Sequence, residues 1–380
     1  MNETLSLGRI AGVRVGLHWS VLVIVVLIAF GLARGRLPAA HPGYSAPAYW
    51  ALAVLTAVVF LASLLAHELA HAIVARRNDV QVDGITLWML GGAARLRSEA
   101  PTPGAELRIA AVGPLTSLLV GAVFTGLAVG LDALRTAGLV VEAVAWLAGI
   151  NIVLALFNAL PAAPLDGGRL LHSFLWHRSG DRLRATRGAS AAGRVLGWLM
   201  VATGFASVLF GGNLSGIWAA MVGWFLIAAA TAEARQAELR GLLNGIPVSR
   251  VMTHTPVCVP ATVTIAQFLA EGPFYHYRHP AFPVLATDGR VAGLVTVDLI
   301  THVPVHERST ITLGDVMRPL PEVETATPDD MVVDLLPRLD ASTDHRALVL
   351  DDEGHLVGIV TRADISRTVA WLTTAGRTRG

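Results

Sequence analysis

The chain has 380 residues, of which 53% are hydrophobic and only 15% are charged, and its mean hydropathy is +0.57. About a quarter of the residues of a water-soluble protein are charged, so this composition excludes a chain that is soluble throughout. The formal net charge of +1 argues against a nucleic-acid-binding protein, because such proteins carry a large basic surplus on one face. The single cysteine, Cys258, allows neither an internal disulfide nor a thiolate cluster, so any metal ion must be held by histidines and carboxylates.

Charge is distributed unevenly along the chain. Residues 1–240 contain long uncharged stretches, whereas residues 245–380 have the composition of an ordinary globular domain, with the boundary near 244–247. This pattern predicts a polytopic α-helical membrane domain over 1–240, followed by a soluble domain over 245–380.

Six uncharged stretches approach the roughly 20 apolar residues that a helix needs to cross the hydrocarbon core. The predicted spans are Val15–Gly31, Tyr49–Ala75, Ile109–Leu131, Ala143–Ala163, Val195–Phe210 and Gly216–Thr231. The last two are short for a full span and are joined by a tight turn at 211–213. Arginines gather in the loops on one side of these spans, and short Arg-rich loops stay in the cytoplasm. We therefore expect a multi-pass cell-membrane protein whose termini and soluble half are all cytoplasmic.

Three ionisable residues lie inside the second predicted span. His67 and His71 are one helical turn apart, so both imidazoles can bind one Zn²⁺, and Glu68 lies beside them to take a proton from water. A chance match on a solvated helix is the alternative, but burying these side chains in a membrane span without partners would cost several kcal/mol. The pattern therefore favours a hydrolytic metal centre.

The segment 79–97, between the second and third spans, combines partial alternation, β-forming residues and Asp-Gly and Gly-Gly turns. This pattern predicts short β-hairpins rather than a helix. A cytoplasmic loop without a role in substrate binding is the alternative.

A catalytic zinc needs three protein ligands, and Asp166 is the first acidic residue after the fourth predicted span. The prolines and glycines around it are expected to break the helix and let the carboxylate turn inward, although an Asp that caps a helix is the alternative. The arginine-rich side of the spans places it at the same depth as the His pair. Four other histidines lack ligand spacing and are expected to be interfacial or solvated: His18, His41, His172 and His177. The basic run 178–194 is expected to lie against anionic lipid, with a protein partner as the alternative.

Together these motifs resemble the site-2 protease family of intramembrane zinc metalloproteases. The segment 67–71 resembles the family's HExxH motif, 158–168 resembles its NxxPxxPxDGG motif, and Gly113-Pro114 resembles its Gly-Pro pair. The resemblance implies a polytopic protein with a membrane-associated β element over 79–97 that holds the substrate strand.

The same resemblance implies how the site works. One zinc per chain would be held by His67, His71 and Asp166, and Glu68 would activate the water that attacks a peptide carbonyl. Asn158 would help to polarise or position the substrate, with a helix-packing hydrogen bond as the alternative. The implied substrate is a single-span membrane protein within the bilayer, such as a membrane-tethered regulator. A metal-ion transporter and a catalytically idle membrane scaffold are the rival functions.

The soluble half is an internal repeat. Val251-Met252 matches Val316-Met317, and 293–296 (Gly-Leu-Val-Thr) matches 358–361 (Gly-Ile-Val-Thr), both with an offset of 65 residues. Copy one covers about 247–305 and copy two about 310–372, each with the order of strands and helices of a small α/β domain.

This repeat resembles a tandem pair of cystathionine-β-synthase (CBS) domains, which bind adenine nucleotides such as AMP or ATP. The resemblance implies ribose contacts from Thr361 and Asp364 in copy two, and from Thr296 and Asp298 in copy one, where the spacing is one residue short. The implied role is a cytoplasmic nucleotide sensor that regulates the protease, and a homo-oligomer formed through these domains is also implied. A purely structural dimerisation pair is the alternative.

Overall fold

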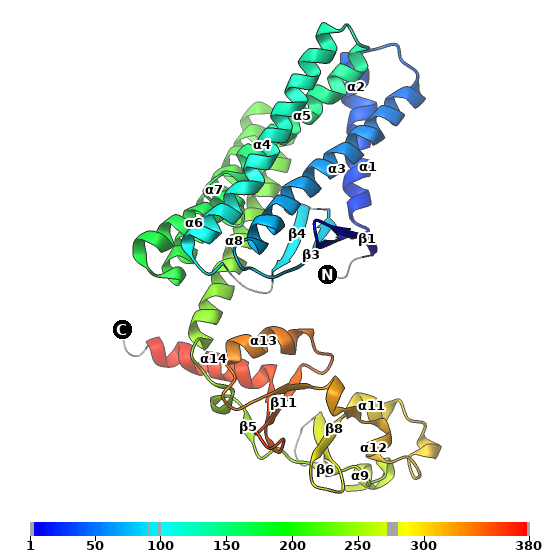
Figure 1. The fold of residues 1–380 in the computed structure, drawn as a ribbon, viewed down its shortest axis with the longest axis vertical. Helices are drawn as coiled ribbons and strands as arrows, with labels where there is room; N and C mark the ends of the chain where they lie inside the picture. The colour runs from blue at the N-terminus through cyan, green and yellow to red at the C-terminus, as the bar shows by residue number, and fades with distance from the viewer. Residues whose placement is uncertain (1–3, 90, 97–99, 272–279, 378–380) are drawn as a thin grey trace. The chain divides into compact units, whose positions relative to one another are not determined.

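The computed structural model describes residues 4–89, 91–96, 100–271 and 280–377 (Figure 1). Of the predicted β segment 79–97, residues 90 and 97 therefore lie outside the described residues. The chain divides into two compact units, Met1–Ala237 and Glu238–Gly380.

The first unit is built from helices, and six helical segments of the described chain are long and apolar enough to cross a membrane. This confirms the six predicted spans. The helices are α1 (Val21–Gly31), which continues through η1 (Leu32–Arg36) and α2 (Leu37–Ala40), then α3 (Ala46–Arg76), α4 (Pro103–Ala133), α5 (Gly138–Asn158), α7 (Arg182–Gly211) and α8 (Ser215–Leu243). Both α7 and α8 are much longer than the short fifth and sixth spans predicted from the uncharged runs, since each helix continues into charged sequence.

Large apolar side chains cover the outside of these helices. Leu119 is 66% exposed, Trp218 67% and Phe210 90%. Exposed side chains of this kind would be unfavourable against water, whereas hydrocarbon solvates them. The surface is therefore that of a multi-pass membrane protein.

A four-stranded sheet, in the order β1-β2-β3-β4, accompanies the helices. The predicted hairpin is present as β3 (Val82–Trp88) and β4 (Gly91–Leu96), which pair antiparallel. The other two strands, β1 (Leu5–Ile10) and β2 (Val13–Leu17), were not expected. Residues 11 and 12 both have positive φ, as in the tight turn of a two-residue hairpin.

This N-terminal hairpin corrects the start of the first span. The side chain of Val13 packs in the core with Ala72, Ile85 and Leu87, and Val15 is also buried. β2 pairs in parallel with β3, with Val15 opposite Ile85. The valines that extended the apolar run toward residue 15 therefore belong to a strand. The first span begins only at Val21.

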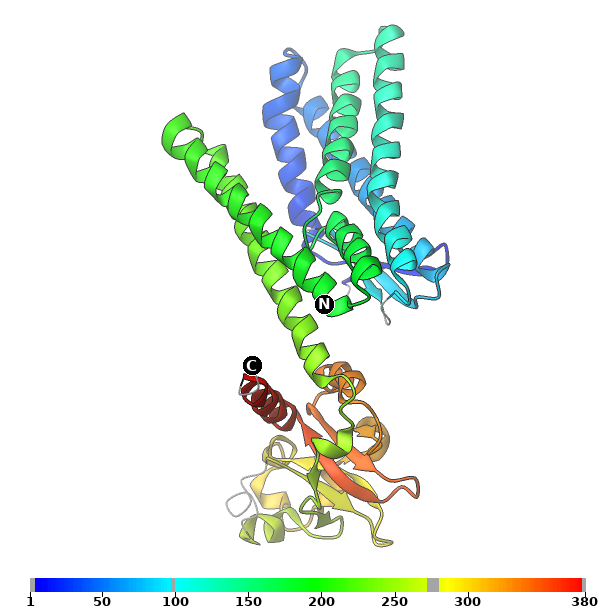
Figure 2. The same cartoon turned by 90° about the vertical axis from the view of Figure 1, so that its left-hand side faces the viewer.

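Helices α7 and α8 form a hairpin and run side by side (Figure 2). A Cβ at Gly197 would meet the Gly223 carbonyl oxygen, and a Cβ at Gly204 would meet that of Gly216. Small residues thus let the two backbones touch, which is a common way to pack membrane helices. The turn begins at Gly212, whose φ of 60° suits a residue without a Cβ.

The second unit contains two four-stranded sheets that exchange a strand. One sheet has the order β6-β7-β8-β9 and the other β10-β11-β12-β5, so each opening segment pairs with the sheet of the other copy. The first copy contains β5 (Thr253–His254), β6 (Val259–Pro260), α9 (Ile265–Glu271), β7 (Ala281–Leu285), β8 (Val291–Thr296) and α11 (Val297–Thr301). The second contains α12 (Leu313–Val316), β9 (Arg318–Pro319), β10 (Glu324–Ala326), α13 (Val332–Ala341), β11 (Arg346–Leu350), β12 (Leu356–Thr361) and α14 (Arg362–Arg377).

The repeated glycines make this exchange possible. A Cβ at Gly293 would overlap the backbone of Arg318, and a Cβ at Gly358 would overlap the side chain of Met252. The two positions are 65 residues apart, so the same close approach occurs once in each copy.

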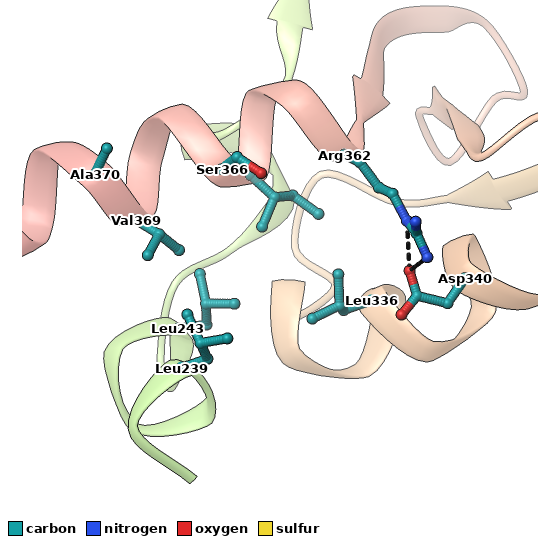
Figure 3. Close-up of a pocket in the computed structure, with 9 residues that line it drawn as sticks. Leu239, Leu243, Leu336, Asp340, Arg362, Ser366, Val369 and Ala370 are labelled. Atoms are coloured by element: carbon teal, nitrogen blue, oxygen red, sulfur yellow. Dashed lines mark hydrogen bonds and ion pairs between the residues drawn. The ribbon is translucent and has the colours of Figure 1, made fainter. Parts of the chain in front are cut away.

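The end of α8 belongs to the second unit. Leu239 and Leu243 line a hollow of about 420 Å³ together with residues of α13 and α14, and an ion pair between Arg362 and Asp340 lies at its edge (Figure 3). Leu243 is 1% exposed and belongs to the core of copy two. The chain therefore enters the second unit within a helix.

Gly293→Ala should destabilise the second unit by roughly 1–3 kcal/mol, because the new methyl group displaces the paired β9 strand. We expect several-fold faster limited trypsin cleavage within Glu238–Gly380 of the full-length protein in detergent. Ala292→Ser, on the same strand, is the matched control and should be cleaved at the wild-type rate. Equal rates for all three proteins would contradict the strand-exchange packing.

Candidate metal centre

The two histidines of the HExxH motif lie side by side on α3. His67 is 3% exposed and His71 9%, and their ring centroids are 4.8 Å apart. Residues four apart on a helix share one face, so the spacing alone places these two rings together. Both rings are buried inside the first unit.

Asp166 is brought to this pair by the first turn of α6 (Asp166–Ser179), a helix that was not expected. The carboxylate was expected to turn inward from a broken helix, but Asp166 is the first residue of a new one. The turn packs tightly, because a Cβ at Gly167 or Gly168 would overlap the backbone of 159–163. A Cβ at Gly193 of α7 would overlap the Ala163 carbonyl from the other side. The two glycines after Asp166 thus let α6 begin directly against the loop.

The three side chains form a nearly equilateral set of ligand atoms. Nε2 of His67 lies 3.1 Å from Nε2 of His71, and Oδ2 of Asp166 lies 3.2 Å from each of them. Nitrogen and oxygen ligands bound at about 2.0–2.1 Å to a tetrahedral zinc ion lie roughly 3.3 Å from one another. The donor set therefore fits a zinc ion with one position left for water or substrate.

Helix α4 holds both imidazoles from behind. Nδ1 of His71 donates to the Ile109 carbonyl oxygen at 2.6 Å, and Nδ1 of His67 lies 2.9 Å from the Ser117 hydroxyl. A carbonyl oxygen can only accept, so Nδ1 of His71 carries the proton and Nε2 keeps its lone pair for a metal ion. This is the usual arrangement of a metal-binding histidine and its hydrogen-bond partner.

Gly113 provides the space for the rings. A Cβ at this position would overlap the His71 ring and would lie 2.7 Å from Nε2 of His67. The next residue, Pro114, lies inside α4 and has no N–H, so the helix lacks one hydrogen bond here. Ile109, Gly113 and Ser117 follow one another at intervals of four residues, and so form one stripe of α4 that faces the His pair.

The side chain of Glu68, on α3, lies against the sheet. Its side chain is half-buried, and it interacts electrostatically with His71, His67 and Asp166. A Cβ at Gly92 would overlap Cγ and Cδ of Glu68, so the backbone of β4 passes directly against this carboxylate. The edge strand and the candidate base therefore belong to one site.

The other predicted site residues are Asn158 in the first unit and the Thr–Asp pairs in the second unit. Asn158 is the last residue of α5, and its side chain forms no hydrogen bond with the part of the chain that the structure describes. In copy two, the backbone N–H and hydroxyl of Thr361 donate to Oδ2 of Asp364 at 3.0 and 2.7 Å. In copy one, Thr296 caps α11, and the Asp298 side chain is 82% exposed. The two copies thus differ at this position.

One histidine prediction is wrong. His172 was expected to be interfacial or solvated, but it is 8% exposed and hydrogen-bonded on both ring nitrogens. It lies on α6, which the hydropathy pattern did not reveal. The sequence interpretation also missed Ser117, although its place one turn after Gly113 could have indicated it.

Comparison with known proteins identifies the families of both units. Residues 55–202 match the model of Peptidase family M50, and residues 248–305 and 313–370 match that of the CBS domain. The Mycobacterium tuberculosis (strain H37Rv) protein Rip3, a zinc metalloprotease by name, is 44% identical over 370 residues, covering 97% of this chain and 93% of its own. Zinc metalloprotease MJ0392 of Methanocaldococcus jannaschii is 29% identical over 373 residues, covering 98% of both chains.

Among solved structures, the site-2 protease from Methanocaldococcus jannaschii matches with a TM-score of 0.42 and 26% identity, covering 61% of this chain and 95% of that one. The extent of the Rip3 match decides the assignment, because it runs through both units. The chain belongs to the site-2 protease family of zinc metalloproteases, Peptidase family M50, and carries a tandem pair of CBS domains.

Proposed function

We propose that the protein hydrolyses a peptide bond in or next to the transmembrane segment of a single-span membrane protein, with His67, His71 and Asp166 holding the zinc ion. The observation that carries the proposal is the set of three ligand atoms 3.1–3.2 Å apart inside a membrane helix bundle. Membership of a protease family favours this function over the transporter and scaffold alternatives.

The chemistry follows from the side chains around the site. Zinc bound there supplies a Lewis acid that polarises the peptide carbonyl and makes water a better nucleophile. Glu68 takes the proton of the attacking water and delivers it to the leaving amine nitrogen. Asn158, whose amide has no partner among the described side chains, is free to hydrogen-bond to the substrate carbonyl. The stripe of α4 keeps both imidazoles in the orientation that the reaction needs.

The sheet supports a mode of substrate binding. A helical segment hides its peptide bonds, so a transmembrane substrate must unwind before it is hydrolysed. β4 is the last strand in the described order β1-β2-β3-β4, and its backbone passes against Glu68 at Gly92. An unwound substrate chain that adds to this edge as a further strand would have its peptide bonds next to the base. The substrate class that fits is a membrane-tethered regulator released by one cut near the cytoplasmic face.

The second unit is proposed to be a cytoplasmic adenine-nucleotide sensor, with the termini on the same side. Asp364 is 8% exposed, and its second carboxylate oxygen accepts from Arg367 at 2.7 Å. A ribose hydroxyl at this oxygen would replace Arg367, and the freed guanidinium would then be available to a phosphate. In copy one the exposed Asp298 lacks this arrangement, so we place the nucleotide in copy two. Because α8 continues into the core of copy two, a change there acts on a helix of the protease unit.

Glu68→Gln should retain one zinc per chain but lose cleavage by roughly 10²–10⁴-fold, because the amide cannot take a proton. Cleavage of single-span membrane reporters reconstituted with the protein, measured beside zinc content, checks this. Glu271→Gln, in the second unit, is the control and should cleave normally. The mechanism is wrong if Glu68→Gln cleaves at the rate of the control.

Gly113→Ala should weaken zinc binding roughly tenfold or more, because its methyl group occupies the place of the His71 ring. The affinity is measured by competition with a chelator. Gly126→Ala, on the same helix but with open space around it, is the matched control. Equal affinities for the two variants would show that the zinc ion is not held beside Gly113.

Asp364→Ala should abolish the binding of AMP and ATP to the full-length protein, because the carboxylate that accepts the ribose hydroxyl is gone. Isothermal titration with each nucleotide measures the binding. Asp298→Ala, at the corresponding place in copy one, should bind like the wild type. An absence of binding by the wild type at millimolar nucleotide contradicts the sensor role.

A further inference from the structure

A second group of buried polar side chains lies outside the metal centre, around His172. Its Nδ1 is 2.8 Å from Oε2 of Glu106, and its Nε2 is 3.1 Å from the Thr186 hydroxyl. Glu106 is in the first turn of α4 and Thr186 is on α7, so one imidazole connects three helices. The catalytic scheme makes no use of this cluster.

The hydrogen-bond directions show what holds it together. The Thr186 hydroxyl lies 3.1 Å from Nε2 of His172 and 3.0 Å from the Arg182 carbonyl oxygen, so it bonds α7 to the far side of the ring. The Glu106 carboxylate accepts from Nδ1. The bond to Glu106 is charge-assisted, because its acceptor is a carboxylate. Such bonds are stronger than neutral ones and fix the separation of the two groups closely.

A neighbouring bond connects the same two helices. The Ser173 hydroxyl donates to the Pro103 carbonyl oxygen at 2.6 Å. Two consecutive residues of α6 are thus bonded to the first turn of α4. The charged neighbours extend the cluster, because Glu233 of α8 interacts electrostatically with Arg169, His172 and Glu106.

Helices α4 and α6 both contribute to the metal centre, and its geometry depends on their position relative to each other. α6 begins with Asp166, six residues before His172 and about 9 Å along the helix axis. α4 supplies the Ser117 hydroxyl and the Ile109 carbonyl that orient the two imidazoles. A shift of α6 along α4 would change the distance from Asp166 to both histidines.

We propose that Glu106 and His172 form a positioning pair that keeps α6 in register with α4, so that the Asp166 carboxylate stays 3.2 Å from both imidazoles. The inference rests on the proposed function in one respect, namely that Asp166 is a metal ligand. His172 acts through Asp166 and is not itself a catalytic residue.

The test measures metal binding by the full-length protein in detergent. His172→Ala should weaken zinc affinity by roughly 10–100-fold, as loss of a partner behind the ligands does. It should also change the visible absorption spectrum of the Co²⁺-substituted protein, which reports the ligand geometry. His177→Ala, on the exposed side of the same helix, is the matched control and should leave both unchanged.

Two conservative variants separate positioning from a general loss of packing. The Asn amide in His172→Asn takes the place of Nδ1 and keeps the bond to Glu106, so its zinc affinity and Co²⁺ spectrum should stay near those of the wild type. His172→Gln reaches Thr186 instead and should behave like His172→Ala. If His172→Ala does not fold, the comparison of His172→Asn with His172→Gln still tests whether the bond to Glu106 positions Asp166.

The outcomes that overturn the inference are distinct from those that overturn the proposed function. Wild-type affinity and spectrum in His172→Ala, or equal behaviour of the Asn and Gln variants, would show that the Glu106 bond does not position the ligand. Retention of zinc by His71→Ala would instead show that the metal centre lies elsewhere.

Discussion

An imidazole buried in a membrane helix bundle has two ring nitrogens that need partners, and this constraint explains how the helices around the HExxH motif are arranged. His67 and His71 both direct Nδ1 at α4, so α4 must lie behind α3 at the depth of the HExxH motif. Both also direct Nε2 toward Asp166, so the first turn of α6 must lie opposite. The site therefore lies where α3, α4 and α6 come together, because all three are needed to provide partners for the ring nitrogens of the two imidazoles.

Glycine makes these close approaches sterically possible. Gly113 lies where the imidazoles need room, Gly92 brings the edge strand against Glu68, and Gly167 and Gly168 let α6 begin against the preceding loop. At each of these positions a Cβ would overlap a side chain or a backbone of the site. The glycines are thus part of the site as much as the polar residues are, because they set the distances at which the polar residues work.

Glycines also permit close approach in the second unit, at equivalent positions of the two copies. Gly293 and Gly358 each admit the opening strand of the other copy, so neither sheet is complete without the other copy. Leu243, the last residue of α8, is buried in the core of copy two. Helix α8 therefore begins in the first unit and ends in the second, so the chain passes from one unit to the other within a helix.

Hydropathy and helical spacing are local properties, so the sequence by itself determined the six membrane helices, the His67-Glu68-His71 face, the β3–β4 hairpin and the repeat of 65 residues. The predictions were wrong for segments whose local pattern fits more than one structure and whose conformation depends on the segments packed against them. Val13 and Val15 extend an apolar run, and only the pairing of β2 with β3 shows that they form a strand. The helix that starts at Asp166 follows Pro161 and Pro164 and continues with two glycines, a composition that is typical of a broken chain.

Only the tertiary structure decided that His172 is buried between Glu106 and Thr186, that Ser117 and Ile109 bond to the imidazoles of the HExxH motif, and that β4 passes against Glu68. None of these relations follows from the pattern of one segment. Burial and hydrogen-bond partners depend on which helices pack together, and that depends on the combined shape and polarity of residues far apart in the chain.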